Sequence, residues 1–252
     1  MTRGKRMKKN NNTKIIFYFI IYFLLFFVLI YSGIKIYEWY RDKNKNNEIA
    51  KKIKETVIVE SNGKNKEEYL IDFDKLKEQN NEAIAWIKVN NTNIEYPVVK
   101  TKNNEFYLNH SFDKSENLGG WIFADYKNKF NGTDKNIVIY GHNMKDNSMF
   151  GTMQNILNPE WYNNEENTNI ILKTEGKNYI YKVFSIYRIE NEDYYIKTEF
   201  NNDSEFEQFL NTLKARSIRD FNMDMLESDS ILTLSTCDNN NKYRVVLHAK
   251  KI

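Results

Sequence analysis

The chain has 252 residues, 41% hydrophobic and 15% aromatic, enough for one globular domain with a sizeable core and an appendage. Its formal net charge of +3 arises at the N-terminus, because six basic residues lie among the first fourteen and residues 15–252 carry 31 basic and 34 acidic side chains. The charge therefore gives no reason to expect nucleic acid as a partner. A single cysteine excludes an internal disulfide framework.

An uncharged, strongly apolar run extends from Ile15 to Ile34. Twenty residues at about 1.5 Å each span roughly 30 Å, the thickness of a bilayer core. We predict a cytoplasmic basic tail over residues 1–14, a transmembrane anchor in membrane lipid over residues 15–36, and an extracellular domain, since basic flanks stay in the cytoplasm. A cleaved signal peptide is the alternative, but no small-residue cleavage site is evident between residues 31 and 40.

The polar stretch over residues 37–68 predicts a membrane-proximal linker with a short amphipathic helix, because Ile49, Ile53 and Val57 recur at helical spacing. A second helix is expected after Asp72 or Asp74, either of which is a suitable N-cap.

Strand patterns then follow at residues 85–89, 94–99, 120–124, 136–140, 169–173 and 178–190. Pro97 indicates an edge position or a strand end. Asp146 is expected to cap a helix that carries five apolar residues on one face: Met149, Phe150, Met153, Ile156 and Leu157. A further helix is predicted over residues 204–216, with Ser204 and Glu207 as its capping box.

The last two predicted strands, residues 230–237 and 243–252, form a hairpin around an Asn-rich turn. Counting back from a tip at Asn240 and Asn241 places Arg244 opposite Cys237, with Cβ atoms roughly 5 Å apart. A guanidinium beside a thiol favours the reactive thiolate and donates hydrogen bonds to a substrate oxygen. The alternative is a buried, inert thiol.

Three histidines are candidate proton carriers. His142 follows an apolar strand and is expected on a loop, where catalytic groups are usually presented. His248 shares a strand face with Arg244 but lies in an apolar run, so we interpret it as structural, and His110 is expected to face solvent. We expect no cofactor and no metal site, because one cysteine and three scattered histidines lack the spacing of metal ligands.

Together these residues resemble the sortase family, and specifically its class B branch. The resemblance rests on Thr-Leu-Ser-Thr-Cys at residues 233–237, on Arg244 and on Gly-His-Asn at residues 141–143. Further matching segments, in the family's order, are Trp86-Ile-Lys-Val, Ile94-Glu-Tyr-Pro-Val-Val, Phe106-Tyr-Leu and Gly119-Gly-Trp-Ile-Phe-Ala-Asp.

The match covers most of residues 70–252, and the catalytic domain is expected at residues 69–252. The resemblance implies a mostly β fold: a closed antiparallel β-barrel with N-terminal helices and a helix inserted before the cysteine hairpin.

The Cys–His–Arg set leads to a hypothesis of transpeptidation. Cys237 attacks a peptide carbonyl, charged His142 protonates the leaving amine, and Arg244 stabilises the oxyanion. By resemblance, the substrate is an Asn-Pro-x-Thr-x sorting motif near the C-terminus of a surface protein, cleaved after Thr. The acceptor is a cell-wall peptide amine, in a peptidoglycan precursor or cross-bridge.

Four neighbouring residues have open roles. Ser235 shares the strand face of the cysteine and either bonds the substrate backbone or is satisfied by a neighbour, and the backbone of Thr236 is a candidate for the oxyanion site. Asp238 is interpreted as a turn cap, and Asn143 either orients the imidazole or is an ordinary loop residue. Two other functions also stay open, a thiol hydrolase with water as acceptor and a non-catalytic surface module.

Overall fold

The computed structural model describes residues 11–55, 57–61, 67–190, 192–237 and 242–252. The chain forms two compact units, residues 1–44 and 45–252. The first contains most of helix α1 (Asn11–Lys54), whose apolar residues from Ile15 to Ile34 are largely exposed. By length and composition alone this helix can cross a membrane, with a mean hydropathy of 2.6 in its most apolar part.

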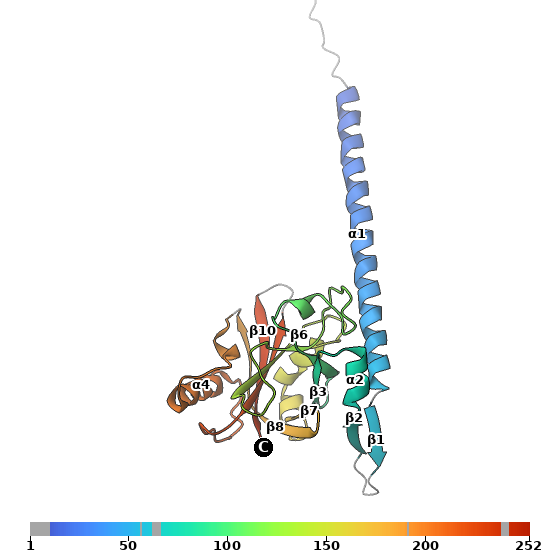
Figure 1. Cartoon of the computed structure of the whole chain (residues 1–252). Helices are drawn as coiled ribbons and strands as arrows, with labels where there is room; N and C mark the ends of the chain where they lie inside the picture. The colour runs from blue at the N-terminus through green and yellow to red at the C-terminus, as the bar shows by residue number, and fades with distance from the viewer. Residues whose placement is uncertain (1–10, 56, 62–66, 191, 238–241) are drawn as a thin grey trace, which may run out of the picture. The chain divides into compact units, whose positions relative to one another are not determined.

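Helix α1 continues without a break to Lys54 (Figure 1). The separate short helix expected around Ile49 and Ile53 is therefore wrong: both residues belong to α1, because no glycine or proline interrupts residues 35–54. Val57 instead opens strand β1 (Val57–Ser61), which pairs with β2 (Glu67–Ile71). Helix α2 (Phe73–Gln79) starts as predicted at Asp72, whose carboxylate accepts a hydrogen bond from the Lys75 amide at 3.0 Å.

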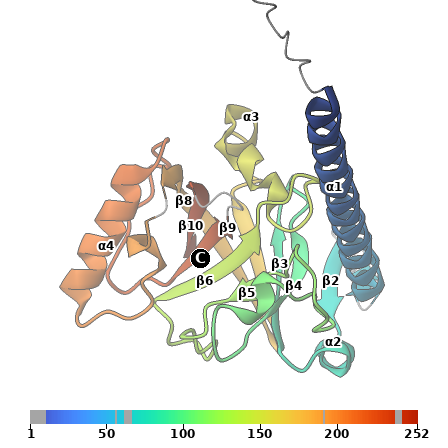
Figure 2. The same ribbon diagram turned by 90° about the horizontal axis from the view of Figure 1, so that it is seen from above.

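Eight strands close into a barrel, as the sequence predicted. Its strands are β3 (Ala83–Val89), β4 (Glu95–Val99), β5 (Phe123–Ala124), β6 (Asn136–His142), β7 (Asn169–Thr174), β8 (Lys177–Glu190), β9 (Ile231–Cys237) and β10 (Tyr243–Lys251). The order around the barrel is β10-β8-β7-β3-β4-β5-β6-β9 (Figure 2). All neighbours are antiparallel except the pairs β4–β5 and β6–β9, which run parallel.

The edge prediction for Pro97 agrees with this topology. Strand β4 pairs with β3 through residues 95–99, whereas its contact with β5 is the single pair Val99–Phe123. Pro97 therefore lies where its missing N–H removes no bond from a second ladder.

The segment after β6 differs from the prediction. Residues 151–157 form a 3₁₀ helix, η2, rather than an α-helix, and Asp146 accepts hydrogen bonds from the Ser148 amide and hydroxyl instead of capping it. A Cβ at Gly151 would lie 2.2 Å from the carbonyl oxygen of Met144, so the chain turns back too tightly for a regular α-helix start. Three short helical elements were also not predicted: η1 (Phe106–Leu108), α3 (Pro159–Tyr162) and η3 (Tyr194–Ile196).

Helix α4 (Asp203–Arg216) lies on the outside of the barrel beside β8, as Figure 2 shows. Its N-cap is Asn202, which accepts from the Glu205 amide at 2.9 Å, so the capping box expected at Ser204 and Glu207 is wrong by two residues. Its apolar stripe consists of Phe206, Phe209, Leu210 and Leu213. These side chains pack with residues of β8, η3 and β10 in a second core outside the barrel, each contributing roughly 1.5–3 kcal/mol of burial free energy.

Candidate active site

Three adjacent strands bring the predicted residues into one row. Strands β6 and β9 run parallel with His142 paired to Cys237. Strands β9 and β10 are antiparallel, and their last pair at this end is Ser235–Val246, so Cys237 and Arg244 each lie two residues beyond it. The three positions therefore lie near one another at one end of the barrel. Asp238 and the expected turn tip at residues 240–241 lie outside the described residues.

His142 is the last residue of β6 rather than a loop residue, because the ladder to β9 continues through it. Its Nε2 lies 2.7 Å from the carbonyl oxygen of Leu108. A carbonyl only accepts, so Nε2 carries the proton in the neutral imidazole and Nδ1 carries the lone pair. Nδ1 is buried and has no hydrogen-bond partner among the described residues, which makes it the nitrogen able to exchange a proton.

The surroundings of His142 keep its imidazole neutral. Burial lowers the pKa of His142, and the hydrogen bond to the Leu108 carbonyl, which favours the charged form, opposes this only in part. The bond to Leu108 does what was expected of Asn143. No sequence pattern marks a backbone carbonyl as a partner, so this contact could not be predicted.

Gly120 allows the backbone to pass directly behind the imidazole. It has φ +55°, and an added Cβ would lie 2.8 Å from Cδ2 of His142 and 2.4 Å from the carbonyl oxygen of Tyr107. It would also lie 2.8 Å from the carbonyl oxygen of Leu108. Only glycine fits a position with this backbone conformation and this approach.

The Gly120 loop is held by Asn46, near the end of α1. The Asn46 amide Nδ2 donates to the carbonyl oxygen of Gly120 at 3.0 Å, and its Oδ1 accepts from the Ser111 hydroxyl at 2.6 Å. Asn46 is buried with both ends of its amide engaged, so it fixes the loop that backs His142.

Arg244 reaches back to the end of β9. Its guanidinium Nη1 donates to the carbonyl oxygen of Thr236 at 3.3 Å, and its side chain is half-buried. The Thr236 hydroxyl accepts from the Val245 amide at 2.8 Å and is fully buried. This hydroxyl extends the contact between β9 and β10 beyond their last ladder pair and so supports the position of Arg244.

The family model described as the sortase domain matches residues 87–252. The chain belongs to the sortase family. This sortase is 34% identical over 233 residues to sortase B of Listeria monocytogenes, and the match covers 89% of this chain and 92% of the relative.

Solved structures similar to this chain are also of sortase B. Sortase B from Bacillus anthracis in complex with AAEK1 has a TM-score of 0.74 and 30% identity, over 84% of this sortase and 99% of that chain. The Staphylococcus aureus sortase B–substrate complex has a TM-score of 0.67 and 34% identity, over 71% of this sortase and 84% of that chain. This sortase is therefore a cysteine transpeptidase of the class B type.

In this sortase Ser235 is fully buried, and its hydroxyl lies 2.8 Å from the hydroxyl of Tyr195 in η3. Of the two alternatives for Ser235, the structure has the hydroxyl satisfied by a neighbour. Tyr195 lies in an element that sequence patterns did not indicate, so the partner was not foreseen.

The other two histidines are engaged elsewhere. His248 is fully buried between the hydroxyls of Tyr187, 2.8 Å from Nε2, and Thr233, 2.9 Å from Nδ1, and burial lowers its pKa to about 3. This agrees with a structural role. His110 does not face solvent as expected: it is half-buried and stacks on Phe106 with ring centroids 4.0 Å apart. Within the described ranges, no three His, Cys, Asp or Glu side chains group as metal ligands.

Proposed function

We propose that Cys237, His142 and Arg244 carry out transpeptidation through a thioacyl intermediate. The proposal is supported by the register: His142 is paired with Cys237, and Arg244 lies two residues beyond the last pair of the neighbouring strands β9 and β10.

In the first half-reaction the Cys237 thiol passes its proton to Nδ1 of the neutral His142 imidazole, and the thiolate attacks the carbonyl carbon of the threonine in the sorting motif. The carbon–nitrogen bond breaks, the leaving amine takes that proton from the imidazolium, and a thioester remains. In the second, an incoming amine attacks the thioester and loses its proton to the neutral imidazole as the thiolate leaves. Nδ1 is the nitrogen for both transfers, because Nε2 is held by Leu108.

Arg244 stabilises the oxyanion of each tetrahedral intermediate. Its planar guanidinium presents several donors in a fixed geometry, and one of them is already directed toward the end of β9. Oxyanion donors are typically worth about 2.7–4 kcal/mol of transition-state stabilisation.

The proposed substrate is a surface protein with an Asn-Pro-x-Thr-x motif near its C-terminus, and the proposed acceptor is an amine of a cell-wall peptide. The similarity to a sortase B solved with its substrate supports the proposed substrate class. We further propose that α1 anchors the enzyme in lipid with residues 1–14 in the cytoplasm, because these residues carry six basic side chains and no acidic one.

The test is product analysis with the full chain in detergent, using an Asn-Pro-x-Thr-x peptide with and without triglycine. Transpeptidation predicts that triglycine diverts the acyl fragment into a ligated product and that Cys237→Ala forms no product. If triglycine neither accelerates cleavage of the peptide nor enters the product, the result would instead favour a hydrolase.

A thiol reagent provides the control for a non-catalytic module. Mass spectrometry should find Cys237 labelled in the native enzyme, and labelling should abolish ligation. A native thiol that resists the reagent, together with unchanged ligation in Cys237→Ala, would rule out the proposed chemistry.

A further inference from the structure

The last turns of α1 belong to the unit of residues 45–252 and bring one polar side chain into it. Asn46, Ile49 and Ile53 recur at helical spacing and so lie on one face of α1. Ile53 is fully buried in the main core, and Ile49 packs against the same core. Asn46 is only 4% exposed, so its amide is removed from water and each hydrogen bond that it leaves unmade is costly.

The neighbours of Asn46 fix which way its amide points. A backbone amide only donates, so the Asn117 atom that lies 2.8 Å from the Gly119 amide is the acceptor oxygen Oδ1. That oxygen lies 3.3 Å from the side chain of Asn46, which must therefore present its nitrogen there. In this orientation Nδ2 also donates to the Gly120 carbonyl, and Oδ1 accepts from the Ser111 hydroxyl. One side chain thus connects α1 to three points of a single loop.

The same loop contacts the imidazole of His142 at two places. The carbonyl oxygen of Leu108 accepts from Nε2 at 2.7 Å. The Gly120 backbone lies so close that a Cβ there would be 2.8 Å from Cδ2 of His142 and 2.8 Å from the Leu108 oxygen. A shift of Gly120 therefore displaces both the ring and the carbonyl group to which the ring is bonded. Gly120 is the residue whose carbonyl Asn46 holds, so the amide of Asn46 acts on the imidazole through one intervening residue.

A second residue of α1 holds the loop more weakly. Lys45 donates to the Ser115 hydroxyl, and its ammonium group lies 3.4 Å from the Asp113 carboxylate. The side chains of Lys45 and Asp113 are 38% and 45% exposed, and ion pairs this exposed are worth at most about 1 kcal/mol. The buried amide of Asn46 is therefore the contact that determines where the loop lies.

We infer that Asn46 is a positioning residue for His142: its amide holds the Gly120 backbone so that Nε2 stays bonded to Leu108 and Nδ1 remains the nitrogen that exchanges protons. The helix proposed as the membrane anchor thus also contributes to the active site through its last turns. The expected effect on rate rests on the catalytic role proposed for His142, whereas the expected effect on the imidazole itself does not.

The experiment is ¹H–¹⁵N NMR of the full chain in detergent with ¹⁵N-labelled histidine. In the wild type the Nε2 proton of His142 should be protected from exchange with water by its bond to Leu108. In Asn46→Ala the Gly120 carbonyl loses its donor, and we expect this resonance to shift or to be lost through exchange. His248, which is fully buried, serves as the internal reference and should not change.

Ligation of an Asn-Pro-x-Thr-x peptide to triglycine is measured on the same samples. In Asn46→Ala kcat should fall by about 10- to 100-fold, because a catalytic group displaced by 1 Å can lose about 100-fold in rate. KM should stay within about twofold, since peptide binding does not depend on the imidazole. Asn46→Ser leaves a smaller cavity, and its hydroxyl is too short to reach the Gly120 carbonyl. It should give the same result and provides the test if Asn46→Ala does not fold.

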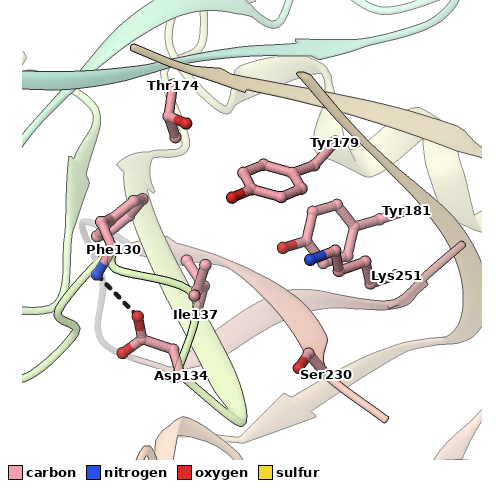
Figure 3. Close-up of a pocket in the computed structure, with 9 residues that line it drawn as sticks. Phe130, Asp134, Ile137, Thr174, Tyr179, Tyr181, Ser230 and Lys251 are labelled. Atoms are coloured by element: carbon pink, nitrogen blue, oxygen red, sulfur yellow. Dashed lines mark hydrogen bonds between the residues drawn. The ribbon is translucent and has the colours of Figure 1, made fainter. Parts of the chain in front are cut away.

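Asn128→Ala is the matched control. Asn128 is 1% exposed, and its amide is also engaged at both ends, donating to the Asn136 carbonyl at 2.7 Å and accepting from the Val138 amide at 2.8 Å. It also donates to Asp134, which Figure 3 shows, at 3.1 Å. Asn136 begins β6 and His142 ends it, so the two are roughly 20 Å apart at about 3.3 Å per residue. Asn128→Ala should lose a comparable melting temperature but keep the His142 resonance and kcat.

An unchanged His142 resonance and an unchanged kcat in the folded Asn46 variants would overturn the inference. So would equal changes in Asn46→Ala and Asn128→Ala, which would indicate a general loss of stability. If the wild type ligates no peptide but its His142 resonance still depends on Asn46, the positioning role holds and the proposed function fails.

Discussion

A methyl group at Gly120 tests whether the loop behind His142 sets the position of its imidazole. Gly120→Ala places a side chain at φ +55°, which costs about 1–2 kcal/mol of stability. The new Cβ would lie 2.8 Å from Cδ2 of His142, whereas carbon atoms pack at about 3.5 Å or more. The imidazole must therefore move by about 0.7 Å or the loop must yield.

Because a displacement of 1 Å in a catalytic group can cost about 100-fold in rate, we expect kcat/KM to fall by roughly 10- to 100-fold. The measurement is ligation of an Asn-Pro-x-Thr-x peptide to triglycine by the full chain, with thermal unfolding recorded in parallel. Only part of the loss should be recovered by lowering the temperature, since the defect is one of geometry as well as stability.

Gly176→Ala is the matched control. Gly176 has φ +74° in the turn between β7 and β8, and nothing lies within 4 Å of an added Cβ. This variant should lose only the part of the stability that arises from the positive φ, about 1–2 kcal/mol, and keep its kcat/KM. The reasoning fails if Gly120→Ala stays within about twofold of the wild type, or if the two variants lose activity equally.

Three further predictions concern single side chains. Arg244→Lys should lower kcat/KM by about 100-fold or more, because an ammonium group cannot reproduce planar donation, and near-normal ligation would contradict its role. Thr236→Val should destabilise the fold by about 1–3 kcal/mol, since the Val245 amide loses its acceptor, and an unchanged melting temperature would refute this. Burial holds the pKa of His248 at about 3, below its usual value of about 6.5. The neutral form belongs to the fold, so its contribution to stability is complete above about pH 6.5 and decreases toward pH 3, by about 2 kcal/mol at pH 5. Denaturant unfolding of His248→Gln should lack this part of the pH dependence, and an identical slope in wild type and variant would show that His248 is not its source.

Much of the fold was predictable because each long strand carries its own pattern. The hairpins β3–β4, β7–β8 and β9–β10 follow from alternating apolar residues around turn residues, and the α4 stripe follows from helical spacing. The short elements lack such a repeat. Strands β1 and β2 pair only with each other, and helix η3 is tied to a distant strand through the bond between Tyr195 and Ser235.

The candidate site was predictable only for side chains with distinctive chemistry. The position of Arg244 followed from counting along a hairpin, and the position of His142 from the end of an apolar strand. The groups that support these side chains could not be identified from the sequence, for a physical reason. The partner of His142 is the Leu108 carbonyl, which every residue type possesses, and Asn46 is one of many asparagines in a polar helix until its contact with Gly120 is known.

The parallel contact between β6 and β9 also affects how this enzyme matures. His142 and Cys237 are 95 residues apart in sequence, and closing a loop of that length costs roughly 4 kcal/mol of chain entropy. Such long-range pairs form late in folding, after local hairpins. During folding, His142 therefore reaches its position beside Cys237 only after β6 and β9 have paired. The proposed pair of sulfur and imidazole is thus assembled only when the barrel closes.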